Sequence, residues 1–347
     1  MFFGKGSPAL ATAIVIVNYK NTLDVQECVA SLADLIECGE IGIFIVENGG
    51  AEAFDALVEG LIAPGGPCVV LPPHRLTNLI GEGTRHKRCS MLETAQKRRL
   101  VAVAEATDNL GYGGGINSWL ERLQFFPFWE AFWILNPDTT PHPKALSALR
   151  TACAGQRGAM ASSTIVDYRR ADYVMTRGML WRWWRGNAVH VDGGKRIGEH
   201  TAPGGGTAID SPSGTSIYVT RACLDQIGYI KEDYFLYYED LEWGMRAKKA
   251  GLLVRADSSI VPHKYGTTIG SAIKRKDRSR IAVYLETRNN LRFNWSLNPY
   301  SIVWILPRTI LRAFEYLLVG SSRNAAATLA GVGAFLRGES GRPNFIN

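Results

Sequence analysis

Short apolar runs alternate with segments that repeat apolar residues every three or four positions over the first 150 residues of the chain. The run AIVIVNY at 13–19 is continuously apolar and β-branched, as expected of a strand that is buried on both faces of a parallel sheet. The next segment, TLDVQECVASLADLIE, has helical spacing and leads to a second apolar run, IGIFIVENGG at 41–50. This order predicts a β-α-β unit.

Two later apolar runs also end in polar residues. VAVAEAT at 101–107 precedes Asp108 and Asn109, and FWEAFWIL precedes Asn136-Pro137-Asp138. Ligands of open parallel sheets bind beyond the carboxyl ends of the strands. We therefore expect ligand contacts from the polar residues that follow the four runs: Asn18, Tyr19, Glu47, Asn48, Asp108, Asn109, Asn136 and Asp138. Turn formation is the alternative role for each of them.

A glycine-rich stretch separates Asn109 from the helical segment INSWLERL, and we expect it to form a turn. Glycines let backbone amides approach an anion, and the helix that follows offers the positive end of its dipole. The spacing of Gly111, Gly113, Gly114 and Gly115 does not match GxGxxG, so a dinucleotide fingerprint is not supported. Helix capping and close packing also require glycine.

Three acids stand together in the stretch FLYYEDLEWGMRAKKAG at 235–251, between aromatic residues and a basic, helix-forming segment. A carboxylate among Glu239, Asp240 and Glu242 suits general-base chemistry, because crowding of acids raises the proton affinity of one member. The alternative is that Asp240 or Glu239 caps the helix. The strand that closes this part of the chain, within GLLVRADSSIVPHKYGTT, carries His263.

Two segments lack a steady period. The Pro-, Gly- and Arg-rich segment 72–100 predicts an exposed excursion from the sheet, either a solvated basic loop or a guide for an anionic ligand. The segment 167–212 looks irregular, and its Trp-Arg cluster at 181–185 suits a membrane interface, a cover over a sugar, or an ordinary loop.

The character of the chain changes after about residue 270. The segment 300–319, YSIVWILPRTILRAFEYLLV, resembles a membrane span, but Pro307, Arg308, Arg312 and Glu315 interrupt it. The charges share one helical face, which predicts an amphipathic helix lying on a bilayer, with a second in NAAATLAGVGAFLRG. The alternative is a helix that packs on the catalytic domain or on a dimer partner. We expect a catalytic domain at 1–268 and an amphipathic helical region at 269–347.

Composition narrows the class of protein. The 347 residues are 46% hydrophobic and 20% charged, which describes a globular chain. Lys plus Arg outnumber Asp plus Glu by 39 to 32, and the pI of about 9.1 favours a phosphate-bearing partner. The six cysteines show no zinc-site spacing and indicate reduced thiols in the cytoplasm. The apolar run near the N-terminus is too short for a spanning helix and lacks a cleavage site after it, so we expect a strand and not a signal peptide.

Seven segments in collinear order over roughly 12–320 resemble family 2 glycosyltransferases of the GT-A fold, in particular bacterial rhamnosyltransferase-like members. They are VIVNYKN, VENGG, DNLGYGGGIN, WILNPDT, SGTSIYVTRACLDQIG, FLYYEDLEW and RNNLRF. The resemblance implies an α/β fold with a Rossmann-like, mostly parallel central sheet flanked by helices. A helical membrane-associating extension would follow at the C-terminus.

The resemblance also implies residue roles. Asn18, Tyr19 and Glu47 would hold the base and ribose of a nucleotide sugar, with Glu47 where the family more often has Asp. Further donor contacts would come from Asn48, Asp108, Asn109, Gly111, Gly114, Asn117 and Asn136. Asp138, in the counterpart of the DxD motif, and His263 would bind a divalent metal, Mg²⁺ or Mn²⁺. Asp240 would be the general base, Glu239 would orient it, and Glu242 would face the acceptor or an active-site loop.

The implied function is inverting, metal-dependent transfer of a sugar, L-rhamnose from dTDP-L-rhamnose, to a lipid-linked or cell-surface polysaccharide acceptor. UDP- and GDP-sugars are alternative donors. A nucleotidyltransferase would need a Gly-rich, basic loop after the first strand, where this chain has NYKNTLDV. A basic nucleic-acid or membrane-binding module would need no acids at strand ends. We expect no nucleic-acid partner. We expect peripheral contact of the C-terminal helices with the inner face of the cytoplasmic membrane, and homo-oligomerisation stays open.

Overall fold

The computed structural model of the protein describes residues 11–36, 39–71, 84–199, 208–264 and 277–344. Its centre is a mixed sheet in the order β12-β7-β11-β6-β1-β2-β5-β4-β3, with β8 added on β7. Strands β1 (Ala11–Asn18), β2 (Ile41–Glu47), β5 (Leu100–Ala106) and β6 (Trp129–Leu135) are parallel neighbours. The predicted α/β class with a parallel sheet centre is confirmed.

Antiparallel strands extend this centre on both sides. On one side, β11 (Ser216–Thr220) lies antiparallel between β6 and β7 (Met160–Asp167), and β12 (Leu253–His263) then pairs with β7 in parallel. On the other side, β4 (His86–Thr94) pairs with β5 and with β3 (Cys68–Val70). The carboxyl ends of the parallel strands thus meet the start of β11 at one edge.

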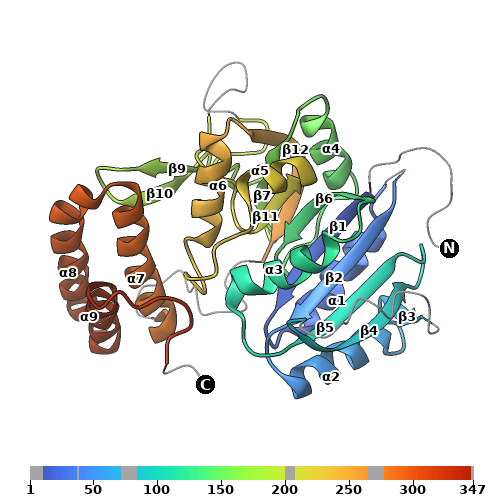
Figure 1. Ribbon diagram of the computed structural model, residues 1–347, viewed down its shortest axis with the longest axis horizontal. Helices are drawn as coiled ribbons and strands as arrows, with labels where there is room; N and C mark the ends of the chain where they lie inside the picture. Colours follow the sequence, from blue (N-terminus) through green and yellow to red (C-terminus); the bar gives the residue numbers. More distant parts are fainter. Residues whose placement is uncertain (1–10, 37–38, 72–83, 200–207, 265–276, 345–347) are drawn as a thin grey trace.

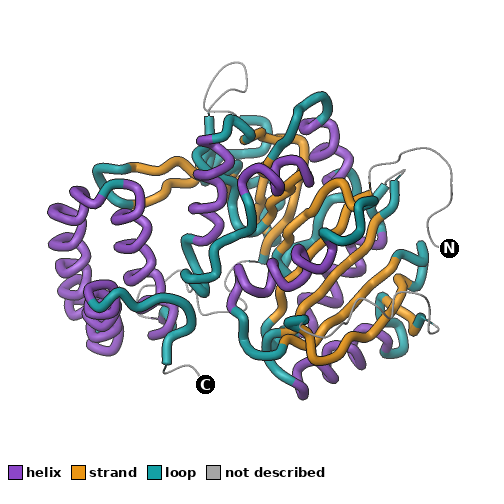
Figure 2. Tube along the Cα trace, in the orientation of Figure 1, coloured by secondary structure: helices purple, strands orange, loops and turns teal. Residues whose placement is uncertain are grey.

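Helices cover both faces of the sheet (Figure 2). Ile14 and Ile16 of β1 face one core with α1 (Thr22–Ala33), α2 (Ala51–Ile62) and α4 (Ala145–Cys153). Val15 and Val17 face the other core with α3 (Gly111–Leu123), α5 (Arg221–Ile227) and α6 (Glu239–Lys249). Every residue of β1 is buried, because a β-branched strand between two helical layers has no solvent face.

The glycine-rich stretch is not a turn before a helix, as the sequence predicted, but the first turn of α3. Glycine is needed there for close packing. A Cβ on Gly115 would lie 2.7 Å from a methyl carbon of Val17, and the added atom would therefore push the helix off the sheet. The helix N-terminus still lies beside the strand ends, as expected.

Two predictions about irregular segments are wrong in part. Within the basic segment 72–100, His86–Thr94 forms β4, because its ladder with β5 satisfies the backbone; residues 72–83 lie outside the described part of the chain. Within 167–212, three short strands form: β8 (Val174–Thr176), β9 (Met179–Arg182) and β10 (Asn187–His190). The Trp-Arg cluster lies at the β9–β10 hairpin.

The C-terminal helices α7 (Arg280–Leu297), α8 (Ile302–Leu318) and α9 (Ser322–Leu336) form a bundle at one end of the molecule (Figure 1). A short 3-10 turn, Pro299–Ser301, joins α7 to α8. Both α8 and α9 pack against α7, which itself contacts the loop before α6. Among the described residues, no helix is long and apolar enough to cross a membrane.

Candidate active site

The carboxyl ends of β1 and β2 place Asn18 directly opposite Glu47 in the parallel register. Asn18 Nδ2 donates to Glu47 Oε2 at 2.5 Å, and the backbone N–H groups of Lys20 and Gly49 donate to Glu47 Oε1 at 3.0 and 2.6 Å. Burial raises the pKa of Glu47, and these donors oppose the rise. Within the described part of the chain, Asn18 Oδ1 is buried without a partner, so it can accept a hydrogen bond from a ligand.

The next predicted contacts surround the start of α3. Asn48 Nδ2 donates to Gly111 O at 2.9 Å, and Asn109 Oδ1 accepts from Gly111 N at 3.1 Å. Asp108 is exposed, and its ion pair with Arg342, at 2.5 Å, lowers its pKa. Tyr19 directly follows Asn18 at the end of β1 and is partly exposed, with the Lys20 ammonium 5.4 Å from its ring centre.

Two predicted donor-binding residues have other contacts. Asn117 Nδ2 donates to Ile230 O and to Glu232 Oε1, both at 2.8 Å. A Cβ on Gly114 would lie 3.2 Å from Glu232 Oε2. These contacts hold the segment 230–232 against α3. Nucleotide contacts by Asn117 and Gly114 stay predictions.

Asp138 and His263 come together although 125 residues separate them. The buried His263 Nε2 lies 3.1 Å from the buried Asp138 Oδ1, because the segment after β6 forms an isolated bridge, Thr139 with His263, to the end of β12. Asn136 begins the same turn, and its backbone N–H donates to Thr215 O at 3.0 Å. The resemblance paired Asp138 and His263 as metal ligands, and their geometry is compatible with that prediction.

A short chain of contacts connects this pair to the acids of α6. The Tyr112 hydroxyl lies 3.1 Å from Asn136 Oδ1 and 2.6 Å from Gly214 O, and Gly214 N donates to Asp240 Oδ2 at 2.9 Å. Burial, followed by the neighbouring acids, raises the pKa of Tyr112, which keeps its hydroxyl protonated. A Cβ at 214 would lie 2.6 Å from Asp240 Oδ2, so a larger residue there would displace this carboxylate.

The three acids occupy the first turn of α6 but have different surroundings. Glu242 is paired with Lys231 and Arg246, each at 3.0 Å. Glu239 is 2% exposed, and burial together with Asp240 raises its pKa to about 8. Asp240 is partly exposed, and burial raises its pKa, while the backbone N–H groups of Leu241 and Gly214 oppose the rise. Asp240 is therefore the acid best placed to exchange a proton with a ligand.

The backbone before these acids is strained. Phe235, Tyr237 and Tyr238 have φ values of 66°, 71° and 79°, in the left-handed region that bulky residues rarely adopt. Each residue in this conformation destabilises the folded state by on the order of 1–3 kcal/mol. The conformation is kept only where surrounding contacts hold it, often at functional sites. Tyr112 N donates to Phe235 O at 2.8 Å, which ties the loop to α3.

Two asparagines of α7, for which no role was predicted, hold this loop. Asn289 is fully buried, and its Nδ2 donates to the carbonyl oxygens of Tyr234, Leu236 and Tyr237 at 2.8, 2.7 and 3.0 Å. Asn290 Nδ2 donates to the Tyr238 hydroxyl at 2.6 Å. The signal was present in the segment RNNLRF, since two adjacent asparagines in a largely buried helix imply hydrogen-bond partners.

A pocket of about 330 Å³ opens beside His263 and Thr215. Its lining includes Asp167, Arg170, Tyr173, His190, Thr215 and His263. Burial lowers the pKa of His190, and the charge of Asp240 opposes that shift. Arg170, Tyr173 and His190 were not predicted as site residues, because 167–212 has no steady period. The pocket lies between the Asp138–His263 pair and the segment that contains β8–β10.

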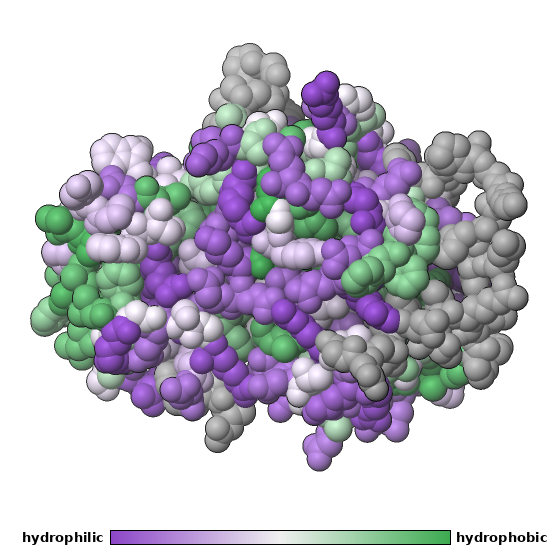
Figure 3. All heavy atoms as spheres, viewed as in Figure 1, coloured by the Kyte–Doolittle hydropathy of each residue, from purple (hydrophilic) through white to green (hydrophobic). Residues whose placement is uncertain are grey.

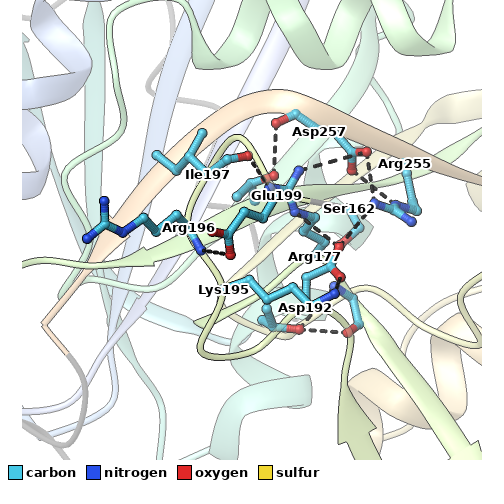
Figure 4. Close-up of polar contacts among 12 residues, drawn as sticks. Ser162, Arg177, Asp192, Lys195, Arg196, Ile197, Glu199, Arg255 and Asp257 are labelled. Atoms are coloured by element: carbon cyan, nitrogen blue, oxygen red, sulfur yellow. Dashed lines mark hydrogen bonds and ion pairs between the residues drawn. The ribbon is translucent and has the colours of Figure 1, made fainter. Parts of the chain in front are cut away.

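A buried ion cluster fixes that wall of the pocket (Figure 4). Arg177, 1% exposed, lies 3.4 Å from Asp192 and donates to Ile197 O at 2.6 Å. Arg255 of β12 pairs with Asp257 at 2.8 Å and approaches Asp192 at 3.9 Å. Removing one partner of a buried ion pair typically lowers the free energy of unfolding by about 3–5 kcal/mol. The cluster therefore holds 174–197 firmly against the sheet.

Comparisons with known proteins bear on the fold. No family model matches the chain. The hexosyltransferase Agl10 of low-salt glycan biosynthesis in Haloferax volcanii is 26% identical over 94 residues, which are 27% of this chain and 29% of that protein. The chain thus matches less than a third of the length of this relative.

Among solved structures, GalNAc-T7 with UDP, GalNAc and Mn²⁺ superposes with a TM-score of 0.50 and 13% identity, over 82% of this chain and 51% of that one. The chain has a GT-A-like fold. The mannosyltransferase PcManGT from Pyrobaculum calidifontis, in complex with GDP-Man and Mn²⁺, gives a TM-score of 0.48 with 11% identity over 94% and 75% of the two chains. In the GT-A-like fold of this chain, the residues described above lie at the carboxyl edge of the sheet, where ligands of open α/β sheets bind.

Proposed function

We propose that the protein is a metal-dependent, inverting glycosyltransferase of family 2 that moves a hexose from a nucleotide sugar to a hydroxyl of a glycan or lipid-linked acceptor. One observation carries this proposal. The contacts from Asn136, two residues before Asp138, through Tyr112 and Gly214 to Asp240 place a potential metal pair and a potential base close together at one sheet edge. The GT-A-like fold and the similarity to a hexosyltransferase over 94 residues support it.

The donor end of the site fits a nucleoside diphosphate. Asn18 and Glu47 at the ends of β1 and β2 offer acceptors to a base or ribose, and the start of α3 offers the positive end of a helix dipole to the diphosphate. The resemblance of the seven segments to rhamnosyltransferase-like members favours dTDP-L-rhamnose as the donor. UDP- and GDP-sugars are the alternatives, and UDP occurs in the GalNAc-T7 structure.

The residues present fit a divalent cation. Asp138 and His263 offer a carboxylate oxygen and an imidazole nitrogen within 3.1 Å of each other, both on buried side chains. Among the described residues, no group of three or more His, Cys, Asp or Glu side chains could hold a metal ion by itself. The donor diphosphate would therefore complete the coordination, and a mixed oxygen and nitrogen set favours Mn²⁺ over Mg²⁺. When bound, the cation would stabilise the charge of the departing diphosphate.

Asp240 is the proposed general base. Its carboxylate accepts two backbone N–H groups and remains partly exposed, so it is fixed in place and still accessible to an acceptor hydroxyl. The hydroxyl would lose its proton to Asp240 as it attacks the anomeric carbon, and the nucleoside diphosphate would leave from the opposite face. Glu239, protonated at neutral pH, would not compete for this proton.

The pocket beside Asp240 is the proposed acceptor site. Tyr173 and Arg170 line this pocket, and the guanidinium groups of Arg170 and Arg196 lie 4.5 and 5.8 Å from the Tyr173 ring centre. An acceptor in this pocket would be bounded by His190 and Thr215. A lipid-linked or polysaccharide acceptor at the inner face of the cytoplasmic membrane is the proposal that fits the C-terminal helices.

A donor panel tests the proposal. The melting temperature of the full chain is measured with dTDP-rhamnose and with UDP- and GDP-sugars, each with Mn²⁺ and with EDTA. Stabilisation by one nucleotide sugar that requires Mn²⁺ is the expected result. Release of nucleoside diphosphate separates a glycosyltransferase from a nucleotidyltransferase, which would release pyrophosphate. No stabilisation by any member of the panel would contradict the proposal.

A further inference from the structure

One face of α8 is apolar and exposed. Val303 is 78% exposed, Leu311 58%, Phe314 57% and Leu318 87%, and these positions recur at helical spacing. Ile305, Ala313 and Tyr316 point the other way and are buried against the bundle. Figure 3 shows apolar residues gathered over the end of the molecule that α8 and α9 form. Monomeric proteins rarely leave so large an apolar patch uncovered without a partner.

The tip of the β9–β10 hairpin continues this face. Arg308 of α8 donates to Trp184 O at 2.6 Å, and the Trp183 and Trp304 rings meet edge to face at 6.2 Å. Trp183 and Trp184 are themselves 61% and 50% exposed. Tryptophan gathers where an apolar phase meets water, because its ring is apolar and its indole N–H is polar. We call the exposed residues of α8 together with 182–185 the α8 face.

Positive charge accompanies the apolar residues. Arg182 and Arg185 flank the two tryptophans, and Arg308 of α8 contacts Trp184 beside them. Glu315 is the one acid in the sequence of α8, and the segment 179–190 has none. A second copy docked by two-fold symmetry would bring these arginines toward each other. An anionic lipid surface would instead attract them, by about 1 kcal/mol for each residue near the surface.

We propose that the α8 face binds the surface of a bilayer rich in anionic lipid, with α8 lying in the plane of the interface. The apolar side chains enter the boundary between headgroups and acyl chains, and the arginines remain among the headgroups. The inference goes beyond the proposed reaction and does not depend on it. Because the hairpin that carries Trp183 also ends in His190 at the pocket, membrane binding would hold the pocket near lipid-linked molecules.

Vesicle co-sedimentation of the full chain tests this proposal. Vesicles of phosphatidylcholine with phosphatidylglycerol are compared with vesicles of phosphatidylcholine alone. We expect binding to the anionic vesicles that the double variant Leu311→Glu, Leu318→Glu weakens at least ten-fold. Arg182→Ser with Arg185→Ser should weaken binding to the anionic vesicles by about five-fold for each charge removed, and should barely change binding to neutral ones.

The matched control changes exposed apolar residues elsewhere. Leu23 and Phe125 are 74% and 71% exposed and lie outside the α8 face, so Leu23→Glu with Phe125→Glu should bind vesicles like the unchanged chain. Brominated lipid should quench tryptophan emission, and Trp183→Phe with Trp184→Phe should remove most of that quenching. Melting temperatures confirm that each variant folds.

Three results would overturn the proposal. The first is an unchanged chain that does not bind anionic vesicles. The second is equal loss of binding in the control variant and in the Leu311, Leu318 variant. The third is a dimer, found by light scattering, that the Leu311, Leu318 variant dissociates while vesicle binding is absent, because a second copy would then cover the face. None of these readouts needs turnover, so failure of the proposed reaction would be seen separately.

Discussion

At the scale of single residues, the first turn of α6 contains three carboxyl groups with three different states. Glu242 is paired with Lys231 and Arg246, Glu239 is enclosed with its pKa raised to about 8 by burial and by Asp240, and Asp240 is oriented by backbone N–H groups. The positive end of the α6 dipole favours an acid at all three positions. Differences in burial and pairing, and not the residue type, separate a base from its neighbours.

The variant Asp240→Asn should keep donor binding and lose turnover. The amide preserves size but cannot accept the proton, so the rate should fall by roughly 10²- to 10⁴-fold, as general-base catalysis typically supplies. Single-turnover transfer and calorimetric donor binding are the measurements. The matched control is Glu242→Gln, which should cost less. A smaller loss from Asp240→Asn than from Glu242→Gln would show that the base is misassigned.

The stability of the protein should depend on the protonation of Glu239. Its folded pKa of about 8 exceeds the ordinary value of 4.5, so the folded state holds a proton that the unfolded state releases. This contribution is present below pH 4.5 and is lost as the pH rises through about 8. The unfolding constant should therefore increase by at most ten-fold per pH unit for this one group.

Glu239→Gln removes that titration. Urea unfolding at pH 5, 6, 7 and 8 should show a free energy of unfolding that falls less steeply for the variant than for the unchanged chain. The variant should be the more stable of the two at pH 8. Parallel pH dependence of the two proteins would contradict the buried, protonated state of Glu239.

At the scale of elements, α7 acts as the support of the acid-bearing loop. Asn289 donates to three carbonyl oxygens of a backbone that contains left-handed residues, and Asn290 donates to the Tyr238 hydroxyl. Asn289 touches no proposed substrate, so it is a positioning residue. Loss of the Asn289 amide should shift the loop and, through it, the position of the acids of α6.

The variant Asn289→Asp keeps the shape of the side chain and removes the donor. Each buried carbonyl left without a partner costs about 1–3 kcal/mol, so the free energy of unfolding should fall measurably. Turnover should fall with little change in donor affinity, because the loop adjoins the acids of α6 and not the residues proposed to bind the nucleobase. Ser296→Ala, on the same helix, is the control. Equal turnover in Asn289→Asp and Ser296→Ala would contradict the positioning role.

The pattern of residues predicted most elements that have a single clear period. The strand in 13–19, the strand at 41–50 and the helix over 300–319 are confirmed as β1, β2 and α8. The strand His86–Thr94 was missed, because its alternation is broken by basic residues at an edge where one face is solvated. The helical glycines were missed, because close packing against Val17 overrides the low helix propensity of glycine.

At the scale of the whole molecule, the strand ends gather residues whose order in the chain says little about their distance. The sequence indicated Glu47, Asp138, Asp240 and His263 separately, and the sheet register explains why Asn18 meets Glu47. The contact from Tyr112 to Gly214 and the pocket walls at Arg170 and His190 could not be read from any period, since they join α3, β10 and irregular segments that lie far apart in the sequence. The roles of the predicted residues remain predictions.

The whole arrangement would act as one site only if the sheet edge binds a cation and a nucleotide sugar together. The donor set of one carboxylate and one imidazole predicts that donor binding strengthens with Mn²⁺ and less with Mg²⁺. Asp138→Asn keeps the size of the buried side chain and weakens it as a ligand, so it separates metal binding from folding.

The most direct measurement is calorimetric titration of the preferred nucleotide sugar into the full chain and into Asp138→Asn, each with Mn²⁺ and with EDTA. We expect the unchanged chain to bind the donor at least ten-fold more tightly with Mn²⁺, and Asp138→Asn to bind with the same weak affinity in both conditions. Tight donor binding that is equal with Mn²⁺ and with EDTA, or an Asp138→Asn variant that keeps the full effect of Mn²⁺, would contradict the account.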